Sequence, residues 1–233
     1  MLLWRNFWDT AHRLYVNDRH REVHYRQVAN DFVSVLPADD STADVLDFGC
    51  GEALDAPRIA QRVGTLYLFD TSSYVRERLT ARFAGAARIK VLDEAGYAAL
   101  RPSSLDLIVV NSVVQYLSRE EFVRLLDEWR VCLRPGGVLV IADVVSPESG
   151  LWADIHALLG TARRHGFLLA ALGGLAATVV SDYRRIRSRV GLATYEPEQM
   201  TRLLEDAGFA AARRAENFGF NPKRMTFLAR RHR

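Results

Sequence analysis

The chain has 233 residues, 49% of them apolar and 25% charged, so one globular domain with a sizeable core is expected rather than a disordered or fibrous protein. The net charge of +3 is a weaker excess than an extended nucleic-acid surface needs. Two cysteines without a C-x-x-C pair, and no His/Cys cluster at ligand spacing, argue against a disulfide framework and a metal site and favour the cytoplasm.

The first 38 residues are predicted to be helical, because apolar side chains recur there at roughly helical spacing. From residue 43 to 146, apolar strands alternate with amphipathic helices. The strands are predicted at 44–49, 65–70, 87–93, 104–114 and 137–145, and the helices at 55–63, 73–83 and 119–133. The N-terminal residues contain no continuous apolar segment, so a secretory signal is not expected.

Residues 147–194 interrupt this alternation and are predicted to form a helical insertion. A helix and two further strands, possible partners in a hairpin, are expected in residues 195–233. The whole chain therefore predicts one α/β domain with a doubly wound, mostly parallel sheet of about seven strands and right-handed crossovers. In such a sheet, ligands bind at the carboxyl ends of the strands.

The stretch VLDFGCGEALD at residues 45–55 places a glycine turn directly after the first predicted strand. Gly49 and Gly51 match the start of a dinucleotide fingerprint, but Leu54 occupies the place of its third glycine, and no phosphate-binding G-K-[ST] follows. Instead, Asp47 ends this strand and Asp70 ends the next. Two carboxylates repel phosphates and suit a nucleoside that carries a positive charge, which indicates S-adenosylmethionine.

The sequence resembles the class I S-adenosylmethionine-dependent methyltransferases, a Rossmann-like family, over about residues 45–145 and more weakly to the C-terminus. The resemblance rests on VLDFGCGEA, LFDTS, VLDEAG, LDLIVVNSVVQYL and CLRPGGVLVIADVV in this order. Ala53 departs from the pattern, since many members have a third glycine there. The first 38 residues would then be a lid over the cofactor, residues 43–146 the cofactor-binding core and residues 147–194 a cap over the substrate.

The resemblance implies a set of residues that bind S-adenosylmethionine. Asp47 and the glycines would line the methionine end, Asp70 would hold the ribose, and the others would surround the adenine and the substrate side. The predicted set is Asp47, Gly49, Cys50, Gly51, Asp70, Thr71, Ser72, Asp93, Asn111 and Ser112. The alternatives are helix or turn capping for Asp70 and Asp93, and strand-end hydrogen bonds for Asn111 and Ser112.

No general base is evident from the sequence, and a carboxylate or amine acceptor needs none. His156 in the insertion, Tyr116 after the fourth strand and Asp143 at the end of the fifth are the candidate catalytic residues; a helix-face position, packing and loop capping are the respective alternatives. Tyr15 or Tyr25 on the lid would contact the sulfonium, or pack in the core.

The insertion contains the longest apolar run, at 166–180, which is too short to span a bilayer and has arginines on both sides. Core packing, a cap over an apolar substrate and a peripheral membrane contact through residues 163–189 all remain open. We expect a small, lipophilic acceptor such as a lipid, a quinone-like molecule or a secondary metabolite. An RNA methyltransferase and a regulatory protein that binds S-adenosylmethionine without transfer are the alternatives.

Overall fold

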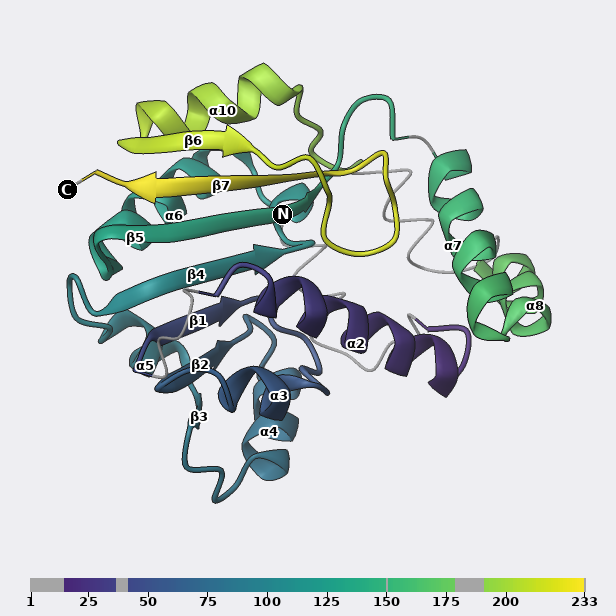
Figure 1. The fold of residues 1–233 in the computed structure, drawn as a ribbon, viewed down its shortest axis with the longest axis horizontal. Coiled ribbons are helices and arrows are strands. Elements are labelled where there is room, and N and C mark those ends of the chain that lie inside the picture. Colours follow the sequence, from purple (N-terminus) through teal and green to yellow (C-terminus); the bar gives the residue numbers. More distant parts are fainter. Residues whose placement is uncertain (1–14, 37–41, 150, 179–190, 233) are drawn as a thin grey trace.

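The computed structural model of the chain describes residues 15–36, 42–149, 151–178 and 191–232. Within them, seven strands form one sheet that runs through the molecule (Figure 1). The strands are β1 (Asp44–Phe48), β2 (Thr65–Phe69), β3 (Ile89–Val91), β4 (Leu105–Asn111), β5 (Leu133–Val144), β6 (Phe209–Arg213) and β7 (Met225–Arg231).

The strand order is β3-β2-β1-β4-β5-β7-β6, in which β1 to β5 are parallel to one another and β7 is antiparallel to both β5 and β6. The predicted doubly wound, mostly parallel sheet is therefore confirmed, as is the final hairpin. Successive strands are added on one side of β1 up to β3 and on its other side from β4 onward, so the order of the strands reverses between β1 and β4, whose carboxyl ends lie side by side. That reversal is where an open α/β sheet leaves a crevice for ligands.

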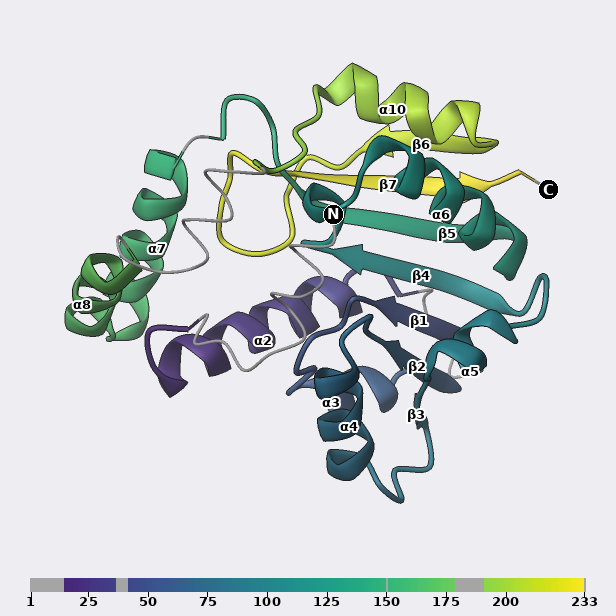
Figure 2. The same ribbon diagram turned by 180° about the vertical axis from the view of Figure 1, so that it is seen from behind.

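Helices cover both faces of the sheet (Figures 1 and 2). They are α2 (Asp18–Val33), α3 (Ala56–Ala60), α4 (Ser73–Arg82), α5 (Glu94–Ala98), α6 (Arg119–Cys132), α7 (Leu151–His165), α8 (Leu168–Thr178) and α10 (Pro197–Asp206), with a 3-10 turn, η1 (Val114–Tyr116). On one face, Phe122 and Trp129 of α6 and Leu204 of α10 are buried in the core. On the other, Phe32 of α2 and Leu79 of α4 are buried.

Several element boundaries differ from the sequence prediction for local reasons. The helix expected at 55–63 is limited to α3, and the strand expected at 87–93 to β3. The helix α5 was not predicted; it begins where the Asp93 side chain accepts a hydrogen bond from the Gly96 amide. The first 14 residues of the predicted N-terminal helix lie outside the described residues.

The insertion forms a helical hairpin of α7 and α8, separated at Gly166, whose φ of +77° ends α7. The hairpin lies beyond the carboxyl ends of the strands, next to the start of α2 (Figures 1 and 2). Phe167 and Ala171 pack there with Val23 of α2. None of the described helices is long and apolar enough to cross a membrane. The arginines at 184–189, which the sequence places after the apolar run as its second basic flank, lie outside the described residues.

Candidate functional site

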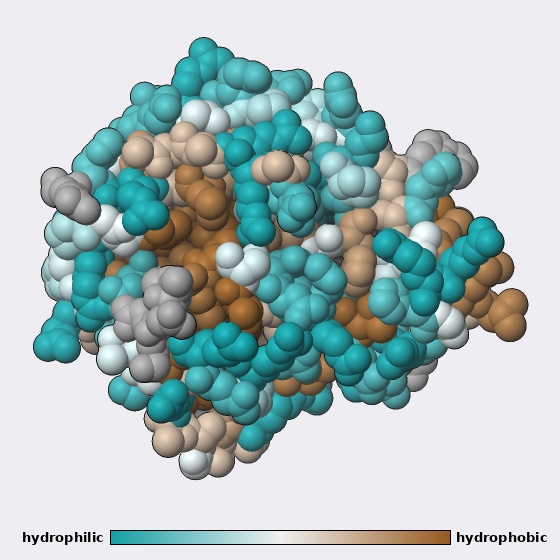
Figure 3. All heavy atoms as spheres, in the orientation of Figure 1, coloured by the Kyte–Doolittle hydropathy of each residue, from teal (hydrophilic) through white to brown (hydrophobic). Residues whose placement is uncertain are grey.

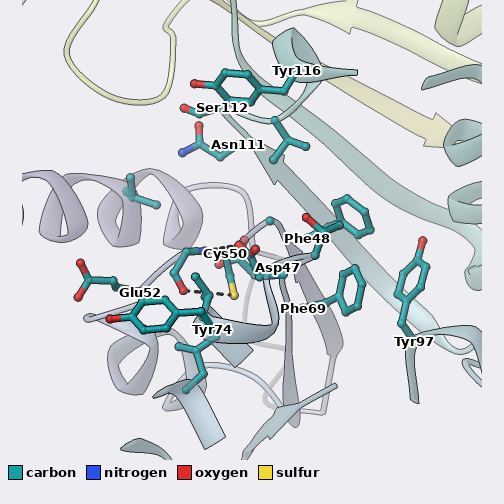
Figure 4. Close-up of a pocket in the computed structure, with 18 of the residues that line it drawn as sticks. Asp47, Phe48, Cys50, Glu52, Phe69, Tyr74, Tyr97, Asn111, Ser112 and Tyr116 are labelled. Atoms are coloured by element: carbon teal, nitrogen blue, oxygen red, sulfur yellow. Dashed lines mark hydrogen bonds between the residues drawn. The ribbon is translucent and has the colours of Figure 1, made fainter. Parts of the chain in front are cut away.

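A cavity of about 610 Å³ lies at the carboxyl ends of β1, β2 and β4. Its walls come from the segments that follow these strands, from one face of α2 and from side chains of α4, α5 and α6. In Figure 4, Asn111, Ser112 and Tyr116 gather at one side of the cavity, and Glu52 and Tyr74 at the other. This position is the crevice that the sheet topology provides for a ligand.

The structure brings most of the predicted cofactor residues together at this cavity. Those that line it are Asp47, Gly49, Cys50, Gly51, Asp70, Thr71, Asn111 and Ser112. Ser72 does not; it is buried and caps α4, its hydroxyl accepting a hydrogen bond from the Val75 amide at 3.2 Å. Asp93 is also outside the cavity, exposed, and caps α5.

The glycine turn after β1 needs residues without a side chain. Gly49 has a φ of +76°, and a Cβ built there would lie 2.4 Å from Cγ2 of Val113. Gly51 has a φ of +56°, and its Cβ would meet the Tyr25 hydroxyl at 3.0 Å. The turn therefore brings bare backbone to the cavity wall, which is how a glycine turn lets a ligand approach closely.

Asp70 joins the glycine turn to the start of α4. One carboxylate oxygen accepts a hydrogen bond from the Gly51 amide at 3.0 Å, and the other from the Ser72 amide at 2.9 Å. The carboxylate lines the cavity in this fixed orientation. Since each oxygen has further lone pairs, the side chain can still accept hydrogen bonds from a ligand hydroxyl.

Asp47 is in a different electrostatic situation, since its side chain is buried and has no ion-pair or hydrogen-bond partner among the described residues. Burial, and secondarily the negative charge of Asp70, raise the pKa of Asp47 to about 7. Elsewhere in the cavity lining, Oδ1 of Asn111 is buried and likewise lacks a partner within the described part of the chain. Both groups are acceptors that a cationic donor would satisfy.

The face of α2 toward the cavity consists of Arg21, His24, Tyr25 and Val28. The Tyr25 hydroxyl accepts a hydrogen bond from the Glu52 amide at 2.9 Å, which ties α2 to the glycine turn. Sequence reasoning did not select Arg21 or His24 as site residues, although the spacing of these four positions, i, i+3, i+4 and i+7, marks one helix face.

This wall of the cavity is uncharged where its rings gather. Burial, together with His20, lowers the pKa of His24 to about 4, so its imidazole is neutral at physiological pH. Burial raises the pKa of Tyr15 to about 12, and the rings of Tyr15 and Tyr25 lie 5.8 Å apart. Both predicted lid tyrosines thus line the cavity as neutral aromatic groups.

The arginines that line the cavity all have partners. Arg21 and Arg82 approach Glu52 at 3.7 and 3.8 Å, and Arg124 approaches Glu128 at 3.7 Å. Arg78 donates to the Tyr74 hydroxyl at 3.1 Å. Because three of these four guanidinium groups already lie beside carboxylates, the cavity offers a phosphate a poorer site than the number of arginines suggests.

The candidate catalytic residues occupy three different environments. Tyr116 lines the cavity. Asp143 lies behind it: its carboxylate accepts a hydrogen bond at 2.6 Å from Ser112, which does line the cavity. His156 is exposed and outside the cavity, because α7 turns Ala162, rather than His156, toward α2. No group of metal-ligating side chains was found among the residues that the structure describes.

Comparisons with known proteins agree with this geometry. Residues 46–141 match a family model described as a methyltransferase domain. An uncharacterized methyltransferase of Mycobacterium tuberculosis H37Rv is 29% identical over 132 residues, which cover 56% of this chain and 64% of the relative. The match therefore spans less than two thirds of that relative's length.

Two solved structures illustrate the similarity in fold. A SAM-dependent methyltransferase from Aquifex aeolicus has a TM-score of 0.56 at 16% identity, over 94% of this chain and 98% of that one. Magnesium protoporphyrin IX methyltransferase from Synechocystis PCC 6803, with bound SAM, has a TM-score of 0.55 at 15% identity, over 98% and 89% of the two chains. At such identities the likeness establishes the Rossmann-like methyltransferase fold.

Proposed function

We propose that this chain, which belongs to the class I S-adenosylmethionine-dependent methyltransferases, transfers the cofactor's methyl group to a small, lipophilic acceptor. The observation that carries the proposal is the pair of carboxylates, Asp47 and Asp70, at the carboxyl ends of β1 and β2, with bare glycine backbone between them. This arrangement suits a ligand that combines a ribose with a positive charge.

The residues present fit the cofactor. Asp70 is held by two backbone amides and can accept the ribose hydroxyls. Asp47 and Oδ1 of Asn111 are buried acceptors without partners in the described part of the chain, and they suit the amino group and positive charge of the methionine end. Bound here, S-adenosylmethionine supplies a methyl group already activated by the sulfonium.

The protein's own contribution is then to position the acceptor and to exclude water. The neutral rings of Tyr15, just before α2, and Tyr25 of α2 form one wall, and Tyr116 lies near Asn111 in the same cavity (Figure 4). His24, with its pKa lowered to about 4, is a weak base. We infer that the acceptor is a nucleophile that needs little deprotonation, and that Tyr116 orients it.

The lipophilic character of the acceptor is supported by the lining of the cavity. Seven aromatic side chains contribute to it: Tyr15, Tyr25, Phe48, Phe69, Tyr74, Tyr97 and Tyr116. Three of the four arginines of the cavity lie beside carboxylates, so the basic composition of the chain does not create a strongly phosphate-binding cleft there. This disfavours RNA as the acceptor.

The proposal is tested with methyl-labelled S-adenosylmethionine incubated with the protein and a cell extract. Label that partitions into organic solvent supports it. Label in the nucleic-acid fraction would identify an RNA methyltransferase instead, and binding without labelled product would identify a regulatory protein that holds the cofactor.

The cofactor site has a separate test in Asp70→Ala. Loss of the carboxylate removes the ribose acceptor and releases the Gly51 amide, so affinity for S-adenosylmethionine should fall by about tenfold or more in calorimetric titration. Asp127→Ala removes an exposed carboxylate from α6 outside the cavity and serves as the matched control. Equal affinities in the two variants would disprove this site.

A further inference from the structure

The described part of α8 presents an exposed apolar face at the end of the molecule. Leu168, Leu169 and Leu172 are 38%, 86% and 50% exposed, while the neighbouring Phe167 and Ala171 are buried. These leucines are at positions i, i+1 and i+4 and therefore lie on one side of the helix. Figure 3 shows the corresponding apolar surface at the edge where α8 lies in Figure 1.

Basic side chains stand next to this leucine face. Arg163, Arg164 and His165 form the last turn of α7 and are exposed. Arg164 donates to the Gly160 carbonyl at 3.3 Å, and no carboxylate of the described residues pairs with Arg163 or Arg164. Apolar side chains beside guanidinium groups that pair with no described carboxylate match a surface that is apolar beneath a layer of negative charge.

We propose that the leucine face of α8, with Arg163 and Arg164, docks onto the surface of an anionic lipid bilayer. The described helix has 11 residues, or about 16 Å at 1.5 Å per residue, so it lies in the interface instead of crossing the hydrocarbon core. The leucines enter the acyl boundary and the arginines contact the headgroups.

Charge favours this partner over a second copy of the chain. In a symmetric dimer, the same patch faces itself, so a contact through the leucine face would bring Arg163 and Arg164 of both copies to one interface. Like charges at close range oppose such a contact, whereas anionic headgroups attract the same guanidinium groups.

The docking surface is connected to the cavity by a short chain of ring contacts. Phe167, directly before α8, stacks on His20 of α2 with ring centroids 5.1 Å apart. His20 lies edge to face on Tyr15 at 5.3 Å, and Tyr15 lines the cavity. A docked hairpin would thus hold the α2 side of the cavity near the lipid, from which an apolar acceptor could enter; only this last step rests on the proposed function.

The test is co-sedimentation with phosphatidylcholine vesicles, with and without phosphatidylglycerol, at low and high salt. The protein should bind the anionic vesicles at least about tenfold more tightly, and salt should remove most of the difference. The double variant Leu169→Asp, Leu172→Asp should lose about tenfold or more on anionic vesicles. The double variant Arg163→Gln, Arg164→Gln should lose about fivefold per charge there and little on neutral ones.

The matched control is Val123→Asp, Val131→Asp, which makes the same change of charge at two exposed valines of α6. It should bind vesicles almost as well as the unmodified protein. Both double variants add two negative charges, so comparing them with each other removes the effect of net charge. Equal vesicle binding by the leucine and valine variants overturns the proposal, as does equal affinity of the unmodified protein for neutral and anionic vesicles.

A dimer seen by light scattering that the leucine variant dissociates, without vesicle binding, would assign the face to a second copy and also overturn the proposal. Thermal unfolding and titration with S-adenosylmethionine establish that each variant is folded and loaded. Because vesicle binding requires no methyl transfer, failure here is distinguishable from failure of the proposed function.

Discussion

At the scale of single residues, the burial of the Asp47 carboxylate lowers the stability of the ligand-free protein. Its carboxylate is buried beside Asp70 without a partner among the described residues, which raises its pKa from the ordinary 3.8 to about 7. A charge arranged in this way stabilises a bound cation while it destabilises the empty site. Functional sites commonly make this exchange of stability for binding.

Asp47→Asn should therefore stabilise the ligand-free protein in a manner that depends on pH. Because the pKa is raised in the folded state, the unfavourable contribution is absent below about pH 4, grows as pH rises and is complete above about pH 7. At pH 8 the variant should gain up to about 4 kcal/mol in free energy of unfolding, and at pH 4 little. Denaturant unfolding at the two pH values, with Asp127→Asn as control, measures the difference.

The same variant should bind S-adenosylmethionine less tightly at pH 8, since it lacks the carboxylate that faces the cation. For the unmodified protein, affinity should strengthen as pH rises toward 7, where Asp47 becomes ionised. A pH profile of binding that is identical in the two proteins would show that Asp47 does not contact the positive charge.

Gly49 offers a second prediction at this scale, with Gly85 as its internal control. Both have a positive φ, +76° and +83°, but a Cβ at Gly49 would lie 2.4 Å from Val113, whereas nothing lies within 4 Å at Gly85. Gly85→Ala should cost about 1–2 kcal/mol through backbone strain alone. Gly49→Ala should cost clearly more and should also weaken cofactor binding; equal losses in thermal unfolding would argue against close packing at the glycine turn.

At the scale of elements, α2 is attached to the cofactor turn by a hydrogen bond from the Glu52 amide to the Tyr25 hydroxyl, beside the ion pair of Arg21 with Glu52. Tyr25→Phe leaves this amide without its partner, which should cost about 1 kcal/mol. Amides of α2 should then exchange hydrogen faster, and affinity for S-adenosylmethionine should fall several-fold. Tyr67→Phe, which removes a hydroxyl with no hydrogen bond among the described residues, should leave both measurements unchanged.

The elements also show how far the sequence alone could go. The strand ends and the glycine turn were predictable, because Asp47, Gly49 and Asp70 are fixed by local chain geometry after two apolar strands. Motif position predicts Asp93 and Ser72 in the cofactor site, but in the structure each is a helix N-cap outside the cavity. Motif position does not reveal on which side of a loop a side chain points.

Tertiary packing accounts for the other differences. The rotation of α7 about its own axis is set by the burial of Ala162 on α2, and it leaves His156 exposed. Conversely, His24 reaches the cavity because α2 buries its opposite face, including Phe32, on the sheet. Helical spacing identifies such faces, but only the fold shows which of them meets the cavity.

At the scale of the whole molecule, one largely buried guanidinium group connects the sheet to the insertion. Arg224, directly before β7, donates to Asp143 at the end of β5 at 2.7 Å and to Asp154 of α7 at 3.0 Å. The Asp143 and Asp154 side chains are only 18% and 22% exposed. Ser112 donates to the same Asp143 carboxylate, so the cavity wall, the sheet and the hairpin share one polar network.

Arg224→Met should therefore destabilise the protein in proportion to the charge left behind. Two partly buried carboxylates would lose their partner, at a cost of about 3–5 kcal/mol in free energy of unfolding at pH 8. Burial already raises the pKa of Asp143 against the opposing effect of Arg224, and without the guanidinium it should rise further. Because the Asp143 carboxyl then becomes protonated, and so uncharged, as the pH falls, the loss of stability should be smaller at pH 5 than at pH 8.

Denaturant unfolding at both pH values measures this, and the double variant Arg224→Met, Asp143→Asn should recover part of the loss at pH 8 because it removes the unpaired charge. Exposed Arg202 of α10, replaced by Met, provides the control for the loss of one guanidinium group. A loss that is the same at both pH values and unaffected by Asp143→Asn would mean that Arg224 contributes packing rather than charge, and that the hairpin is held to the sheet by its apolar contacts alone.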